Sequence, residues 1–346
     1  MYKKRYLIVV LVLVAVLTLA ACQQKAAPDV DTGALPETNK LVIYSPNSEN
    51  LLNAVIPAFE AKYGVKVEVI SAGTGEVFKR LEGEKNNPYA DIVYGGAYAT
   101  FMNNPDLFQE YVSPNNENVI DAYKNTTGYI TPYVLDGSII LVNKSLVGDI
   151  EINGYKDLLN PALAGKIVSA NPTASSSAYA HLTNMLNAIG KGDYESEEAW
   201  QFVADLFANT VVIDSSSAVW KGVRDGEYTV GLSYEDPSAT LVRDGADVEV
   251  IYMEEGAVFL PAGSGIVKGA KNLLNAQRFI DMITSEEIQN VFSTTMTNRP
   301  VIANVETPDY MTPFKDINVI EEDMEYCYVN KDKISDHFKE IYVSNQ

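Results

Sequence analysis

Two stretches of this chain alternate short apolar runs with helical spacing, and this alternation constrains the fold most. In the first stretch, the runs at 40–45, 65–72 and 89–96 read as strands. Between the first two runs, Leu51, Leu52, Val55, Ile56 and Phe59 recur at the spacing of a helix, and a second helical pattern follows at 75–85. Strands separated by helices predict right-handed crossovers and a mostly parallel sheet, hence an α/β fold.

The pattern returns later in the chain. A second stretch has strand-like runs at 165–172, 210–214, 228–236 and 246–253, with helical patterns at 177–190, 197–209 and 217–227. Extended segments at 129–146 and 254–270 connect the two stretches, and a long helical pattern covers 272–294. Two crossings between two α/β blocks predict two hinged lobes with a ligand cleft at the strand ends. We expect lobe 1 to comprise 39–134 plus 258–346, and lobe 2 to comprise 135–257.

The N-terminus has the pattern of an export signal. A basic "MYKKRY" precedes the apolar run "LIVVLVLVAVLTLA", which is shorter than the roughly 20 residues of a membrane-spanning helix. We expect residues 1–21 to be a signal peptide. The following "LAAC", Leu19 to Cys22, resembles the lipobox of bacterial lipoproteins, in which the cysteine is lipidated; an ordinary cleavage site with a chance cysteine is the alternative. Residues 22–38 then form a flexible tether.

The charge and the cysteines limit the partners. The formal net charge is −20, which argues against nucleic acid and against broad adsorption to anionic lipid. Lipidation of Cys22 leaves only Cys327, so we expect no intramolecular disulfide.

Several phrases resemble the solute-binding proteins of ABC importers. They are "LVIYSPNSE", "ADIVYGG", "GEYTVGLSYEDPSA", "GIVKGAKNLLNAQRFIDMITSEEIQ" and "NRPV". The resemblance covers about 38–315 and lies with the ferric-ion, hexose-phosphate and phosphonate binding group. It implies a two-lobe type II periplasmic-binding-protein fold with two hinge crossings, a ligand held between the lobes, and delivery to permease subunits.

Two strand-to-helix junctions of the first block are candidate ligand sites. One carries Ser45 and Asn47, which alternatively serve as helix caps. The other carries Thr74 and Gly75, where a helix N-terminus faces a ligand or the chain simply turns tightly. Gly96 either allows the backbone to approach a ligand or turns the chain.

Two serine clusters precede helices of the second block. One contains Thr173, Ser175 and Ser176 together with Ser177; the other contains Ser215, Ser216 and Ser217. Exposed N–H groups and neutral hydroxyls bind phosphate or phosphonate without a Lys or Arg. The alternative is that these residues only cap their helices.

The sequence "SYEDP" supplies Tyr234, Glu235 and Asp236 at a predicted strand end. The acids would accept hydrogen bonds from ligand hydroxyls or pair with an amine; the alternative is a solvated turn. The ferric-ion members often have adjacent tyrosines here, whereas this chain has Tyr234 alone, so ferric iron is the second hypothesis.

Enzyme motifs are missing from the sequence. His181 and His337 are the only histidines, and neither lies in a nucleophile motif. We therefore predict no catalytic residues, no cofactor and no bound metal. An exported hydrolase and an adhesive lipoprotein remain the alternatives of other classes. We expect a monomer on the outer face of the bacterial membrane, lipid-anchored through Cys22, that captures a small phosphorylated or phosphonate-type solute.

Overall fold

The predicted apolar runs form the strands of one mixed sheet in the computed structural model, which describes residues 37–344. The strand order is β2-β1-β3-β9-β4-β7-β5-β6, and β8 and β10 both pair with β4. The predicted signal peptide, Cys22 and residues 23–36 of the tether lie outside the described residues. The strands are β1 (Lys40–Ser45), β2 (Lys66–Ser71), β3 (Ile92–Ala97), β4 (Thr131–Asn143), β5 (Ile167–Ala170), β6 (Thr210–Ile213), β7 (Val230–Tyr234), β8 (Val248–Ile251), β9 (Phe259–Ile266) and β10 (Arg299–Pro300).

The first block is parallel, as its alternating pattern predicts. Strand β1 pairs in parallel with both β2 and β3. The helix α2 (Glu49–Tyr63) begins at Ser48, whose side chain accepts from the backbone N–H of Leu51, and it ends at Gly64 with a left-handed φ of 63°. Helix α3 (Thr74–Glu84) and the short α4 (Tyr98–Met102) follow β2 and β3. Each helix therefore starts at the carboxyl end of a strand.

The second block repeats this arrangement. Strand β5 pairs in parallel with β6 and β7, and α6 (Ser176–Gly190) follows β5 while α8 (Ser216–Arg224) follows β6. The helices α6 and α7 (Glu197–Phe207) bury Leu182, Met185, Val203 and Leu206 in the largest apolar core. The starts of α6 and α8 consequently lie at the same edge of the sheet.

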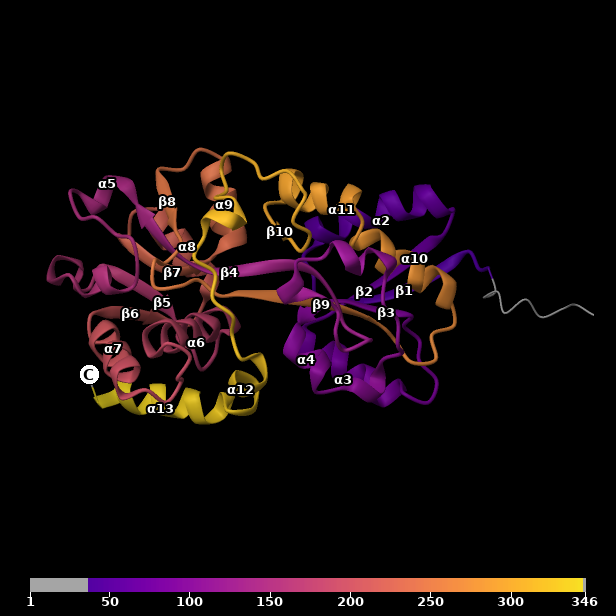
Figure 1. The fold of residues 1–346 in the computed structure, drawn as a ribbon, viewed down its shortest axis with the longest axis horizontal. Helices are drawn as coiled ribbons and strands as arrows, with labels where there is room; N and C mark the ends of the chain where they lie inside the picture. The colour runs from indigo at the N-terminus through magenta and orange to yellow at the C-terminus, as the bar shows by residue number, and fades with distance from the viewer. Residues whose placement is uncertain (1–36, 345–346) are drawn as a thin grey trace, which may run out of the picture. The chain divides into compact units, whose positions relative to one another are not determined.

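The strands β4 and β9 connect the two blocks (Figure 1). They pair antiparallel with each other, while β9 also pairs with β3 of the first block and β4 with β7 of the second. The two extended segments predicted as crossings are these strands. All the described residues belong to one compact unit.

The region after β7 differs from the prediction. The strand ends at Tyr234, and Glu235 and Asp236 begin the helix α9 (Glu235–Arg243) instead of continuing a strand into a turn. Pro237 is tolerated because it lies in the first turn, where its missing N–H has no intrahelical partner to lose. The acids therefore belong to a helix start.

The long helical pattern predicted at 272–294 is divided into several shorter helices in the structure. The first helix ends at Ile283, and Ser285 caps the next helix, because its side chain accepts from the backbone N–H of Ile288. No element is predicted beyond 315, yet two helices follow there; α13 lies beside α7 (Figure 1). Among residues 37–344, no helix combines the length and hydropathy of a membrane-spanning segment. Besides several short 3-10 helices, the remaining helices of the described residues are α5 (Lys144–Val147), α10 (Leu273–Ile283), α11 (Glu286–Val291), the π-helix η6 (Phe292–Met296), α12 (Met324–Val329) and α13 (Lys331–Ser344).

Candidate functional site

A cavity of about 1020 Å³ lies beside the crossing strands β4 and β9. The first block contributes the starts of α3 and α4 to its wall, the second block contributes the starts of α6 and α8, and α12 contributes a further side. The carboxyl ends of strands in both blocks therefore face the same cavity, as in other open α/β sheets. The sequence-predicted residues that line it are Thr74, Gly75, Gly96, Ser175, Ser176, Ser215, Ser216 and Tyr234.

The start of α6 combines a cap with free polar groups. Ser175 is the N-cap residue: its Oγ accepts from the Ala178 backbone N–H at 3.3 Å and lies 3.1 Å from the Ser177 Oγ. The neighbouring Ser176 lines the cavity, and its hydroxyl has no hydrogen-bond partner among the described residues. The first amides of a helix also have no intrahelical acceptor. The α6 N-terminus therefore offers both a hydroxyl and N–H groups to an anion.

The start of α8 is left uncapped by its own side chain. Ser215 has the extended N-cap conformation, but its hydroxyl makes no capping bond and instead lies 3.0 Å from the Ser217 Oγ. Ser215 and Ser216 both line the cavity. The Ala218 backbone N–H donates to the Ser215 carbonyl at 3.1 Å, whereas the two earlier amides of α8, those of Ser216 and Ser217, depend on solvent or a ligand for their acceptors.

The start of α3 approaches β3 closely through glycine. Thr74 and Gly75 begin α3 after Gly73, which provides no side-chain cap. Gly96 has a φ of +113°, and a Cβ there would lie 3.2 Å from the Thr74 methyl. A larger residue at 96 would be strained and would crowd Thr74. Glycine at position 96 therefore allows the start of α3 to lie close to the backbone of β3.

Four other predicted residues make internal contacts and do not line this cavity. Ser45 is buried and donates to the Tyr94 carbonyl, and Asn47 accepts from the Tyr133 hydroxyl at 2.9 Å. Thr173 donates from both its N–H and its hydroxyl to the Asn171 side chain, at 3.0 and 2.9 Å. Ser217 contacts Ser215, as described above. Ser45 and Asn47 do not cap α2, whose N-cap is Ser48, and Thr173 makes the contact of a turn, through the Asn171 side chain.

Glu235 is occupied by a buried ion pair. Only 1% of its side chain is exposed, and its carboxylate accepts from Arg299 Nε at 2.9 and 3.0 Å and from the Tyr252 hydroxyl. Arg299 also donates to the Thr312 carbonyl and lies over the Phe259 ring. A carboxylate that is paired and desolvated in this way is not available to a ligand.

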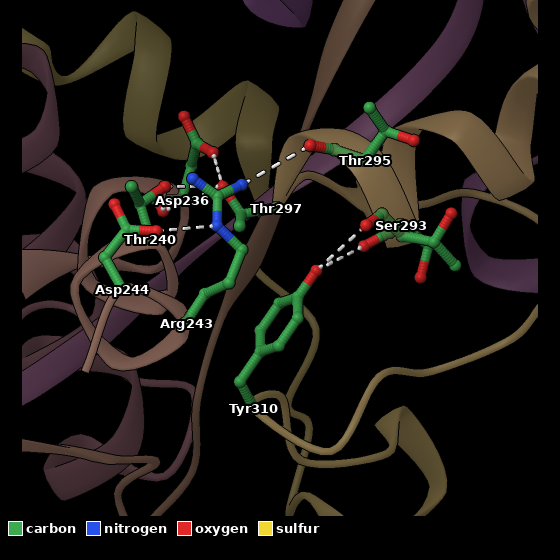
Figure 2. Close-up of polar contacts among 9 residues, drawn as sticks. Asp236, Thr240, Arg243, Asp244, Ser293, Thr295, Thr297 and Tyr310 are labelled. Atoms are coloured by element: carbon green, nitrogen blue, oxygen red, sulfur yellow. Dashed lines mark hydrogen bonds and ion pairs between the residues drawn. The ribbon is translucent and has the colours of Figure 1, made fainter.

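Asp236 faces a second, smaller cavity of about 620 Å³. Figure 2 shows its surroundings, where the Thr297 hydroxyl donates to Asp236 Oδ1 at 2.6 Å and lies 2.7 Å from the Thr240 hydroxyl. Arg243 donates to the Thr295 carbonyl at 3.3 Å, and burial raises the pKa of Asp236. These contacts connect α9 to the end of η6. Asn47 also lines this smaller cavity.

Asp136 lines the cavity and was not among the residues predicted from the sequence. It lies on β4 between buried neighbours, its side chain is exposed, and it lines both cavities together with Tyr234. The surrounding protein desolvates the carboxylate, and the charges of Asp236 and Glu235 add repulsion, so the pKa of Asp136 is raised well above its usual range. The signal in the sequence was an acid inside the apolar run "YVLDGSIILV".

The C-terminal segment adds further polar groups to the large cavity. Glu322 accepts from the Thr183 hydroxyl at 2.6 Å, and burial raises its pKa to about 7. Lys331, the one basic residue in the lining, lies with its Nζ 5.5 Å from the Tyr179 ring centre. The lining acids are Asp136, Asp214 and Glu322, so acids outnumber bases in this wall.

Known proteins share this architecture. The family model of the bacterial extracellular solute-binding proteins matches residues 41–295. The periplasmic binding protein AfuA of Actinobacillus pleuropneumoniae, solved with fructose-6-phosphate bound, superposes with a TM-score of 0.69 at 25% identity, over 89% of this chain and 98% of that one.

Two curated relatives carry different ligand names. Iron uptake protein A1 of Synechocystis is 27% identical over 302 residues, which are 83% of this chain and 82% of the relative. A Salmonella typhimurium periplasmic protein, whose name proposes 2-aminoethylphosphonate binding, is 22% identical over 263 residues, which are 73% of this chain and 74% of the relative.

Proposed function

The chain belongs to the bacterial extracellular solute-binding proteins, with the type II periplasmic-binding-protein fold, and on that premise we propose that it captures a small phosphorylated or phosphonate-type solute for an ABC importer. The ligand occupies the cavity of about 1020 Å³. Its anionic group lies at the starts of α6 and α8.

One observation carries this proposal: two serine-rich helix N-termini of the second block open into the same cavity as the start of α3. Ser176 and Ser215 bring hydroxyls, and the first turns bring unpaired N–H groups. Helix N-termini carry about half a positive charge and point their N–H groups outward. Several such ends in one cavity favour a compact multiply charged oxygen anion such as a phosphoryl group.

The negative charge of the protein is compatible with this ligand. Hydrogen bonds from amides and hydroxyls act at contact distance, whereas surface charges are screened over about 8 Å at physiological salt. Lys331 is the one lining cation, so the site relies on helix ends and hydroxyls for its affinity.

Ferric iron is the second candidate, because of the iron uptake relative. It would need oxygen ligands around Tyr234. Glu235 is engaged by Arg299 and Asp236 by Thr297, which leaves Asp136 as the one acid that lines the cavity beside Tyr234 without a side-chain partner among the described residues. Within residues 37–344, no cluster of three or more His, Cys, Asp and Glu side chains is suited to a metal ion. The residues present therefore fit an organic anion better than iron.

The same proposal covers the cellular setting. We propose that Cys22 carries the lipid anchor on the outer face of the membrane, that the monomer hands its solute to permease subunits, and that it performs no catalysis. We also propose that lobe 1 (39–134 plus 258–346) and lobe 2 (135–257) close on the ligand about β4 and β9.

A ligand panel tests the function. The mature protein is screened by thermal shift and then by calorimetry with fructose-6-phosphate, glucose-6-phosphate, 2-aminoethylphosphonate, inorganic phosphate, ferric citrate and thiamine. We expect an organic phosphate or phosphonate to bind and to raise the melting temperature, since a ligand at 100 times its Kd adds about 2.7 kcal/mol of stability.

Three outcomes would contradict the proposal. Tight binding of ferric iron alone would favour the iron hypothesis. Turnover of a phosphate ester would favour a hydrolase. Failure of every small molecule to bind would favour an adhesive lipoprotein.

A further inference from the structure

Asp136 has an unusual position for a carboxylate. It lies within β4, opposite Leu260 of β9, while Ser138 two residues later lies opposite Tyr234 of β7. Side chains two residues apart share a face of a strand, and Asp136, Ser138 and Tyr234 all line the large cavity. The carboxylate therefore sits on the crossing strand at the floor of the cavity, between the two blocks.

No side chain among the described residues forms a hydrogen bond or ion pair with the Asp136 carboxylate. Glu235 has Arg299, Asp236 has Thr297, and Glu322 has Thr183. Around Asp136, the described residues provide one favourable neighbour, the backbone N–H of Glu235, against the repulsion of Glu235 and Asp236. The repulsion from Glu235 and Asp236 disfavours a charged Asp136, and a ligand cation beside this carboxylate would offset that repulsion.

The charge of the lining points the same way. Lys331 is the one base among the lining residues, and it lies against the Tyr179 ring without an ion pair to Asp136, so the described lining supplies no cation to this carboxylate. A positive group on the ligand near Asp136 would balance it, while the helix starts hold the anionic end.

We propose that Asp136 is a specificity-determining residue that binds a protonated amine of the ligand, so that the preferred solute is a zwitterion with a phosphoryl or phosphonyl group at one end and an ammonium group at the other. This inference rests on the proposed function and deepens it. The ammonium donates hydrogen bonds to the Asp136 carboxylate across the floor formed by Ser138 and Tyr234.

The test compares two phosphonates of nearly equal shape. 2-Aminoethylphosphonate and propylphosphonate differ by an ammonium in place of a methyl, and each is titrated calorimetrically into wild-type protein and the Asp136→Asn and Asp136→Ser variants. We expect the wild type to prefer the amine by about 10- to 100-fold, the range of a charge-assisted hydrogen bond. Both variants should lose this preference and bind propylphosphonate at least as tightly as the wild type does, because the substitution removes a negative group from the cavity.

The matched control is Asp214→Asn, which removes another lining carboxylate that is exposed next to α8; we expect it to keep the preference for the amine. Equal binding of the two phosphonates by the wild type, or a preference that survives both Asp136 variants, would overturn the inference while leaving the proposed function standing. Tighter binding of fructose-6-phosphate that depends on Asp136 would overturn it in favour of ligand hydroxyls. Failure of the wild type to bind any phosphonate or phosphate would overturn the proposed function itself.

Discussion

Two titratable residues, the buried His181 and the partly buried Glu322, respond to pH in opposite ways. His181 lies 3.0 Å from the Tyr155 hydroxyl through Nδ1 and 3.0 Å from the Ile139 carbonyl through Nε2, and burial lowers its pKa from 6.5 to about 4. Burial raises the pKa of Glu322 from 4.5 to about 7. Both residues are therefore neutral in the folded protein over much of the range from pH 4.5 to 6.5.

These shifts predict two opposing contributions to stability. The unfolded chain protonates His181 first, so its contribution is complete above about pH 6.5 and is lost as the pH falls towards 4. The unfolded chain deprotonates Glu322 first, so its contribution is complete below about pH 4.5 and is lost as the pH rises towards 7. Each is worth about 3 kcal/mol at most.

We predict that single substitutions separate the two effects in urea denaturation between pH 4.5 and 6.5. Relative to the wild type, the free energy of unfolding of Glu322→Gln should rise with pH, and that of His181→Gln should fall with pH. The wild type serves as the shared reference because all other titrating groups are common to the three proteins. Parallel pH profiles in all three would show that neither group has a shifted pKa.

At the scale of elements, the π-helix η6 ends in a strained residue. Thr297 has a φ of 92°, which is rare for a β-branched side chain, and it is buried. Its hydroxyl bonds to Asp236 and lies against Thr240 on α9 (Figure 2). The strain persists because this hydroxyl connects two elements.

We predict an inverted order for two substitutions at this position. Alanine keeps the unfavourable φ and loses the hydroxyl, whereas glycine loses the hydroxyl but accepts the φ. Thr297→Gly should therefore be more stable than Thr297→Ala by about 1 kcal/mol in urea denaturation. As the control, Ala204→Gly inside α7 should show the ordinary order, with glycine less stable by about 1 kcal/mol. A glycine variant at 297 that is less stable than the alanine variant would contradict the strain.

Elements with a strong pattern were predictable, and those that depend on distant partners were not. The strands of both blocks are apolar runs, so their burial is visible in the sequence. The helix α9 was missed because Asp236-Pro237 is typical of a turn. Its acid Glu235 is buried by Arg299, which lies 64 positions later, and no local pattern reports such a pair.

At the scale of the whole molecule, the fold class and the family were predictable, because the α/β alternation and the phrases that resemble the family extend over most of the chain. The sequence predicted only in part which of the two cavities each polar residue lines. Ser176 and Ser215 line the large cavity, whereas Asn47 and Asp236 line the smaller one. This division depends on how β4 and β9 separate the two hollows. Asp136 lies on that boundary.

The most direct test of the central claim is a calorimetric titration of the tightest phosphorylated or phosphonate ligand into the Ser176→Ala/Ser215→Ala variant. Ser196→Ala is the matched control: it removes the N-cap of α7, which lies away from the cavity, and costs about 1 kcal/mol of stability. If the helix starts hold the anion, the double variant loses about tenfold or more in affinity, while the control binds as the wild type does. An affinity that is unchanged in the folded double variant would contradict the claim that α6 and α8 bind the ligand.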